Sequence, residues 1–213
     1  MNLDFRVVEL LFSRMCHDLV GPVGAAVNGV ELLEEFGGEM ADEAITLLGS
    51  SARVASRRLR VYRVAYGMAA GAAISSLGDL RSLIAEFLDG GKIVLEWPDN
   101  KMPAVHVGRN AIKCILNMSI CAAETLPRGG TLHVGVEQAG ADMVVTMQAK
   151  GQGARLAEGV GEAMGMSVSS ERLDPRTVHS YFTAVIAKHA GSGLKFEEGT
   201  DIVTLSCKVS ASE

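Results

Sequence analysis

The first third of the chain carries apolar residues at the spacing of two long helices. From Asp4 to about Phe36, apolar residues recur at helical intervals, and the segment 36–40 (FGGEM) then interrupts them with a glycine pair that stops a helix. A second run with the same spacing extends from about Ala41 to Tyr66, with arginines between its apolar residues. Two such runs joined by a short break predict an antiparallel helical hairpin.

The pattern changes after a segment of small residues at 67–76 (GMAAGAAISS), whose composition is typical of a connection between domains. Beyond this segment, helical and strand-like stretches are mixed. Helices are predicted over 77–88, 108–125 and about 175–189, and strands over 92–97, 131–138 and 143–149, followed by a hairpin turning near Gly199. The predicted fold class is α+β, with a helical domain at 1–70 and an α/β sandwich at 77–213.

A helical wheel of the first run separates an apolar face from a face of small and polar residues. The apolar residues that share one direction are Val8, Leu11, Phe12, Met15, Leu19, Pro22, Val23, Ala26, Val30 and Leu33. The opposite face carries His17, with small or polar residues along the same side: Ser13, Arg14, Gly21, Gly24 and Asn28. Glycine in a helix interior costs about 1 kcal/mol relative to alanine. This helix is therefore weakened on a side where packing does not require it.

An imidazole with small neighbours is suited to entering the active site of another protein. Glycines after His17 let a partner backbone approach closely, and Pro22 is expected to kink the helix so that His17 is presented at a bend. Asp18 can hold the proton of one ring nitrogen and leave the other nitrogen as a nucleophile. Arg14, Asn28 and Glu31 are expected to add to a partner surface. The competing interpretation of each is a solvated surface residue.

The segment HDLVGP (17–22) resembles the phosphoacceptor motif of histidine kinase dimerisation domains, with an acidic residue after the histidine and a proline at the end. The longer segment 16–35 (CHDLVGPVGAAVNGVELLEE) is similar to bacterial histidine phosphotransferases of the ChpT type, and this resemblance extends over the whole chain. It implies that His17 accepts a phosphoryl group from a receiver-domain aspartate and passes it to another receiver, with Asp18 as its neighbouring acid.

A homodimer is expected for two reasons. Two helices alone bury little apolar surface, so the apolar face of each needs further partners. The family resemblance implies the same arrangement, in which two hairpins form a four-helix bundle with one His17 on each of two outer faces.

The second domain resembles a kinase ATP-binding domain whose nucleotide-binding residues have changed. In segment 111–134, Cys121 stands where that family places a magnesium-binding Asn, and a thiol attracts a hard cation poorly; Asn117 lies one turn earlier. Segment 148–156 (QAKGQGARL) is similar to the glycine box that closes over adenine, with Ala149 in place of the leading Asp. We expect no ATP binding, and we expect the partner receiver domain to supply Mg²⁺.

Composition and charge indicate which classes of partner and which cell compartment to expect. The formal net charge of −5 argues against binding of nucleic acid or an anionic membrane. The four cysteines (Cys16, Cys114, Cys121 and Cys207) lack CxxC spacing, which favours a reducing compartment. With no signal-like or membrane-spanning stretch, a cytoplasmic protein is expected.

The remaining histidines are predicted to be structural. His106, His133, His179 and His189 have no paired Asp, Glu or Cys at ligand spacing, so no metal site is predicted. Gly151 and Gly153 alone are a weak signal for a phosphate loop, and an ordinary loop is favoured.

Three functions remain open from the sequence. The favoured one is a phosphorelay intermediate that moves a phosphoryl group from the receiver domain of a hybrid histidine kinase, through His17, to response regulator receivers. An ATP-dependent histidine autokinase is disfavoured by Cys121 and Ala149. A scaffold that binds receivers without carrying phosphate would not need His17.

Overall fold

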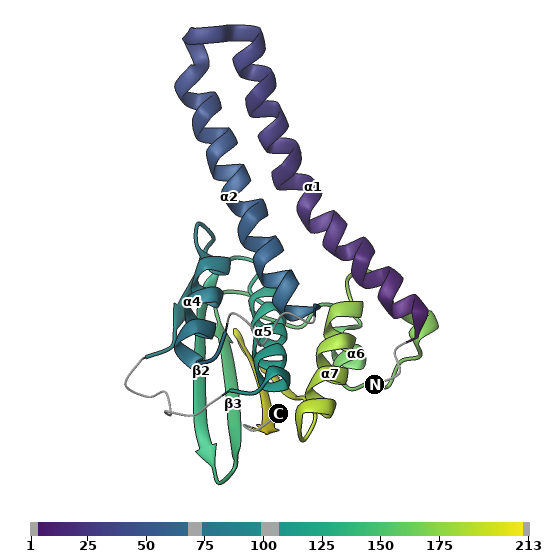
Figure 1. The fold of residues 1–213 in the computed structure, drawn as a ribbon. Helices are drawn as coiled ribbons and strands as arrows, with labels where there is room; N and C mark the ends of the chain where they lie inside the picture. The colour runs from purple at the N-terminus through teal and green to yellow at the C-terminus, as the bar shows by residue number, and fades with distance from the viewer. Residues whose placement is uncertain (1–3, 68–73, 99–106, 211–213) are drawn as a thin grey trace.

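The computed structural model describes residues 4–67, 74–98 and 107–210, which form a long helical hairpin standing on an α/β layer (Figure 1). Most of the predicted connection at 67–76 lies outside the described residues, as does His106. The division into domains at 1–70 and 77–213 stays a prediction.

Helices α1 (Phe5–Phe36) and α2 (Ala41–Ala65) form the predicted antiparallel hairpin, joined by the short helix η1 (Gly37–Met40). The Asp4 side chain accepts the Arg6 backbone N–H and begins α1. The helix is continuous through Pro22 and changes direction about midway along its length (Figure 1). Proline breaks one hydrogen bond of the helix ladder, which accounts for the predicted bend.

A glycine sets the distance between the two helices of the hairpin. Gly29 is buried, and a Cβ at this position would lie 3.0 Å from both the Ala44 carbonyl oxygen and the Leu48 backbone nitrogen. The backbones therefore approach too closely here for a larger residue.

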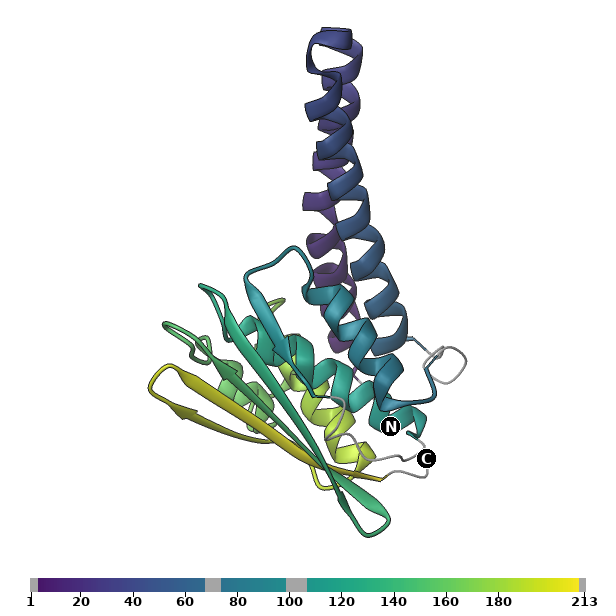
Figure 2. The same ribbon diagram turned by 90° about the vertical axis from the view of Figure 1, so that its left-hand side faces the viewer.

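The rest of the chain forms a five-stranded sheet with helices on one face (Figure 2). Its strand order is β1 (Ile93–Glu96), β2 (Gly130–Ala139), β3 (Asp142–Lys150), β5 (Ile202–Ser210) and β4 (Lys195–Gly199). Only the β1–β2 pair is parallel among these strands. The helices on the covered face are α4 (Leu77–Leu88), α5 (Arg109–Glu124) and α7 (Val178–Ala190).

Alternate strand residues face the helices, as expected for a sheet with one covered face. The buried residues of β3 are Met143, Val145, Met147 and Ala149. The predicted helices and strands are all present, but α6 (Val160–Met164) and η3 (Ser170–Arg172) were missed. These helices are too short to show a helical period, and glycines surround α6.

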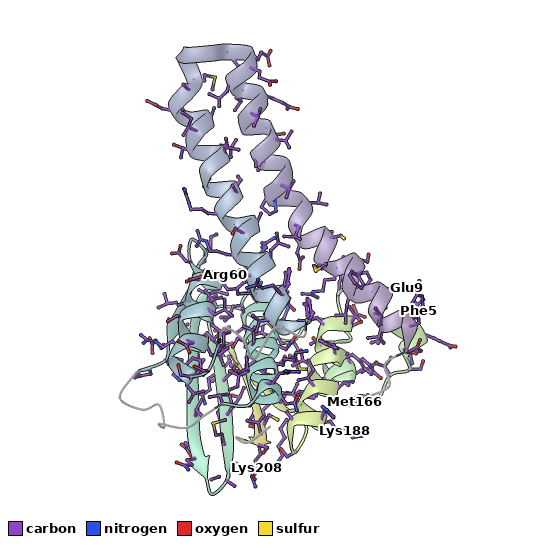
Figure 3. All side chains as sticks on the ribbon, in the orientation of Figure 1. Phe5, Glu9, Arg60, Met166, Lys188 and Lys208 are labelled. Carbon is purple, nitrogen blue, oxygen red and sulfur yellow. The ribbon has the colours of Figure 1, made fainter. Side chains whose placement is uncertain are left out.

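The main core continues from the sheet into the base of the hairpin. Val61, Tyr62 and Ala65 of α2 are buried in this core, and Leu11 and Met15 of α1 pack against it. Figure 3 shows side chains crowded where the hairpin meets the α/β layer, whereas those of the distal hairpin project into open space. No helix within the described residues is both long and apolar enough to cross a membrane.

The distal hairpin leaves part of its apolar face uncovered. Seven large apolar side chains between residues 20 and 59 are 40–68 % exposed: Val20, Val23, Val27, Val30, Phe36, Ile45 and Leu59. A groove of about 490 Å³ between α1 and α2 is lined by Val23, Val27, Val30, Leu48, Leu59 and smaller residues. The apolar face predicted for the first helix is thus only partly buried within one chain.

Candidate functional site

His17 lies on an exposed ridge of α1, with its side chain 89 % accessible to solvent. Exposed residues along the helix beside it are Ser13, Gly21, Gly24, Asn28 and Glu31. A Cβ added at Gly21 or at Gly24 would meet no atom within 4 Å. The open space predicted around His17 is therefore present, while a partner-binding role for these residues stays a prediction.

Asp18 lies close enough to orient the imidazole of His17. The distance from His17 Nδ1 to Asp18 Oδ1 is 3.5 Å, which is long for an N–H···O hydrogen bond. A proton on Nδ1 directed at this carboxylate leaves Nε2 with its lone pair. In that tautomer Nε2 would be the nitrogen available for nucleophilic attack, and this role of His17 stays a prediction.

Two residues of α2 hold Asp18 from the other side. The Tyr62 hydroxyl donates to Asp18 Oδ2 over 2.7 Å, and the Arg58 guanidinium donates to the Asp18 carbonyl oxygen. Burial and the hydrogen bond to Asp18 raise the pKa of Tyr62, so its phenol remains a donor at neutral pH. The spacing of apolar residues places Tyr62 only on an apolar helix face, and it does not predict this role, because no spacing rule connects residues 44 positions apart.

Arg14 does not lie on the exposed ridge where the sequence placed it. Its side chain is 13 % exposed, and its guanidinium pairs with the Glu124 carboxylate of α5. The same group donates to the carbonyl oxygens of Pro175 over 3.2 Å and Arg176 over 3.3 Å, and its Nε lies 3.9 Å from Asp18 Oδ2. A wheel of an isolated helix could not show that the α/β layer covers this side. Arg14 joins α1 to that layer.

The residues at the positions that resemble a nucleotide site are buried against other residues of the protein. Ala149 is fully buried in β3, where its methyl group faces the core. Asn117 is buried and donates to the carbonyl oxygens of Ala65 and Lys113. Cys121 is buried against His179 and Thr183, with Sγ 3.6 Å from His179 Nδ1 and 3.2 Å from Thr183 Oγ1.

Gly151 and Gly153 have structural explanations. A Cβ at Gly151 would lie 2.3 Å from the Gly129 carbonyl oxygen, so this crossing of two chain segments requires glycine. Gly153 has a φ of 74°, and its N–H donates to Asp201 Oδ1 over 2.7 Å. The favoured interpretation as a loop accounts for both residues.

The histidines of the α/β layer differ in their surroundings. His133 Nδ1 lies 2.8 Å from Glu96 Oε2, and His189 is exposed. His179, for which the sequence offered no partner, contacts Cys121 across 58 sequence positions. Within the part of the chain that the structure describes, no three His, Cys, Asp or Glu side chains gather as a metal site.

Comparisons with known proteins indicate the family of the chain. The family model described as the histidine phosphotransferase C-terminal domain matches residues 77–202. The protein phosphotransferase ChpT of Brucella abortus (strain 2308) is 33 % identical over 200 residues, covering 93 % of each chain.

Two solved structures are similar in fold. A bacterial phosphotransferase structure at 1.7 Å is 33 % identical, with a TM-score of 0.83 over 97 % of this chain and 98 % of that chain. The histidine kinase AdeS of Acinetobacter baumannii is 11 % identical, with a TM-score of 0.51 over 92 % of this chain and 98 % of that chain, a likeness of fold alone. By its sequence relatives and its domain match, the chain belongs to the histidine phosphotransferase family of the ChpT type.

Proposed function

We propose that the protein is a phosphorelay intermediate whose His17 takes a phosphoryl group from the receiver domain of a hybrid histidine kinase and passes it to a response regulator receiver. The observation that carries this proposal is an exposed His17 with an acidic neighbour on a ridge cleared by Gly21 and Gly24. Membership of the histidine phosphotransferase family supports it.

The proposed transfer uses His17 as a nucleophile toward phosphorus. Nε2 attacks the aspartyl phosphate of the first receiver, so a P–N bond forms as the P–O bond to the aspartate breaks. Asp18 holds the proton on Nδ1 and stabilises the positive charge that develops on the ring. In the reverse sense, the aspartate of the second receiver attacks the phosphohistidine. The receivers supply the Mg²⁺ that neutralises the phosphoryl oxygens.

The ridge around His17 provides the partner surface in this proposal. If His17 enters the active site of another protein, the residues beside it must leave room for the partner's backbone. Gly21 and Gly24 leave that room, and Ser13, Asn28 and Glu31 offer polar groups at its edge.

We further propose that the chain does not use ATP. The residues in the corresponding positions do not suit the nucleotide, because Cys121 is a soft ligand and Ala149 has no acceptor for the adenine amino group. Both side chains are also buried among internal partners. Calorimetric titration with Mg²⁺ and ATP is expected to give no binding heat at micromolar protein, whereas micromolar affinity would favour the autokinase.

The relay is tested by transfer of labelled phosphate. The protein is incubated with receiver domains that carry a ³²P-labelled aspartyl phosphate, and the label on this chain is followed by gel. We expect a label on the wild type that is labile in acid and stable in base, as for phosphohistidine. His17→Ala is expected to carry no label and to keep its fold, because the His17 side chain is 89 % exposed.

A matched control removes another exposed histidine. His189→Ala on α7 should be labelled as well as the wild type. Absence of label from the wild type across all receivers of the source organism would contradict the relay and favour the scaffold. Label from ATP alone, with no receiver present, would instead identify an autokinase.

A further inference from the structure

A buried polar cluster lies between α5 and α7, distinct from the His17 site. Cys121 Sγ lies 3.6 Å from His179 Nδ1, and His179 Nε2 lies 3.0 Å from Asn117 Oδ1. Asn117 and His179 are fully buried, and Cys121 is 2 % exposed. A thiol, an imidazole and an amide in this order have the arrangement of nucleophile, base and orienting group.

The hydrogen bonds of Asn117 determine which nitrogen of His179 carries a proton. Asn117 Nδ2 donates to the carbonyl oxygens of Ala65 over 3.1 Å and Lys113 over 2.8 Å. Turning the amide around would place its oxygen against these two acceptors, so Oδ1 must face His179 and accept from Nε2–H. In the neutral imidazole, Nδ1 then directs its lone pair at Cys121 and can take the thiol proton.

The surroundings of Cys121 favour its ionised form. Burial alone raises the pKa of this thiol, but the charge of His179 and hydrogen bonds with His179, Thr183 and Ser180 outweigh burial, and the pKa is lowered. Within the described residues, four other charged or titratable groups face the cluster. They are Glu124 of α5, with Oε2 4.0 Å from His179 Nδ1, Arg14 of α1, Arg176 before α7, and Tyr66 after α2, whose ring lies edge-on to His179.

Cys121 is also one of the residues that line a pocket, so the cluster lies next to a space that small molecules can enter. The pocket has a volume of about 280 Å³, and its walls include Arg14, Thr125, Ala157 and Arg176. A molecule of liquid water occupies about 30 Å³, so the pocket has room for a water-sized oxidant.

We propose that Cys121 is a modification site for small hydroperoxides, with His179 as its base and Asn117 as the residue that orients the base. The thiolate sulfur attacks one peroxide oxygen, and an S–O bond forms as the O–O bond breaks, giving a sulfenic acid. The other oxygen leaves as hydroxide or alkoxide and takes the proton held by His179. The sulfur loses two electrons, and the hydroperoxide gains them.

The site is tested on the full chain carrying Cys16→Ser, which removes the exposed cysteine. The protein is treated with hydrogen peroxide and dimedone, which traps sulfenic acid, and peptide mass spectrometry measures the adduct at each cysteine. At pH 7, we expect Cys121 to react at least about ten-fold faster than the buried Cys114, because a hydrogen bond with Cys207 and burial raise the pKa of the Cys114 thiol. Because its pKa is lowered, its rate should level off below the value of about 8.5 at which an ordinary thiol ionises.

Two matched variants test access without touching the cluster. Ala157→Phe adds a ring to the pocket wall and should slow labelling of Cys121 several-fold. Ala85→Phe makes the same change at an exposed alanine of α4 and should leave the rate unchanged.

Three results would overturn the site. They are equal labelling of Cys121 and Cys114, a Cys121 rate equal to that of global unfolding, and an inflection at the pH of an ordinary thiol. Any of them would give the cluster a purely structural role. His179→Asn should reduce labelling at pH 7; if this variant unfolds, the comparison of Ala157→Phe with Ala85→Phe still decides. None of these readouts depends on phosphotransfer.

Discussion

Asp18 uses its two carboxylate oxygens toward different helices. Oδ1 lies 3.5 Å from His17 Nδ1 on α1, and Oδ2 accepts the Tyr62 hydroxyl of α2 over 2.7 Å. A carboxylate held on one side has less freedom to turn away from the imidazole on the other. Tyr62 is therefore expected to act on His17 through Asp18, as a positioning residue.

Tyr62→Phe removes this hydrogen bond and keeps the ring. The variant should lose about 1–2 kcal/mol of unfolding free energy, and the initial rate of His17 phosphorylation should fall several-fold. Chemical denaturation and transfer of labelled phosphate measure the two effects. Because Tyr62 acts through Asp18, the rate losses of Tyr62→Phe and Asp18→Asn should not add in the double variant.

Tyr66→Phe is the matched control for this prediction. Tyr66 stacks on Tyr62 with ring centroids 5.3 Å apart, so its hydroxyl can be removed while the Tyr62–Asp18 hydrogen bond remains. Equal rate losses in the two tyrosine variants, or additive losses with Asp18→Asn, would contradict the positioning role and leave Tyr62 with a packing role only.

At the residue scale, the sequence could reveal only what is local along α1. His17, Asp18 and the glycines lie within one helix, where a wheel relates them directly. Tyr62 and Arg58 come from α2, and Arg14 turns toward Glu124 of α5. These partners depend on how the helices pack against one another, and the spacing of residues along the sequence does not predict that packing.

At the scale of the elements, the glycines of α1 differ in what surrounds them. Gly29 lies against the backbone of α2, whereas Gly21 and Gly24 face open space. From the sequence, all belong to one weakened helix. Only the paired helix shows that Gly29 serves packing and that the others leave one side clear.

Gly29→Ala and Gly24→Ala should therefore change stability in opposite directions. At Gly29, the new Cβ would press on the α2 backbone at 3.0 Å and cost about 1–3 kcal/mol of unfolding free energy. At Gly24, alanine meets no atom within 4 Å and should add about 0.5–1 kcal/mol through its higher helix propensity. Urea denaturation measures both. A loss of stability at Gly24, or none at Gly29, would contradict the packing described for the hairpin.

Element boundaries followed from the sequence wherever a periodic run was long. Both hairpin helices and the strands on either side of residue 140 appear within a residue or two of their predicted ends. The last helix begins later than predicted, at Val178, because Asp174 and Thr177 form a hydrogen-bonded turn ahead of it. Such a turn has no apolar period, so pattern alone cannot separate it from the helix.

At the scale of the whole molecule, aromatic contacts join the two parts of the protein. Tyr62 lies in the main core, stacks on Tyr66, and Tyr66 lies edge-on to His179 of α7. The hairpin base thus connects Asp18 with the Cys121 cluster through packed side chains. A division of the chain by composition could not show this, because the residues on either side of the connection share one core.

The uncovered groove between α1 and α2 of the hairpin is the surface through which we expect two chains to associate. Val23, Val27 and Val30 line it and are at least 40 % exposed, although apolar residues gathered on one face favour burial. A second hairpin laid against this groove would bury them in a four-helix bundle, which is the homodimer predicted from the sequence. The protein should then have twice the chain mass of 22.5 kDa in light scattering at micromolar concentration.

Val23→Glu should convert this dimer to a folded monomer. The residue is 51 % exposed in one chain, so a carboxylate there stays solvated in the monomer but would be desolvated without a partner in the bundle. The control is Val94→Glu on β1, where an exposed valine lies outside the hairpin and the change should leave the mass at the dimer value. Circular dichroism should show the same helix content in both variants. A monomeric wild type, or a Val23→Glu protein that keeps the dimer mass, would show that this groove is not the surface that joins two chains.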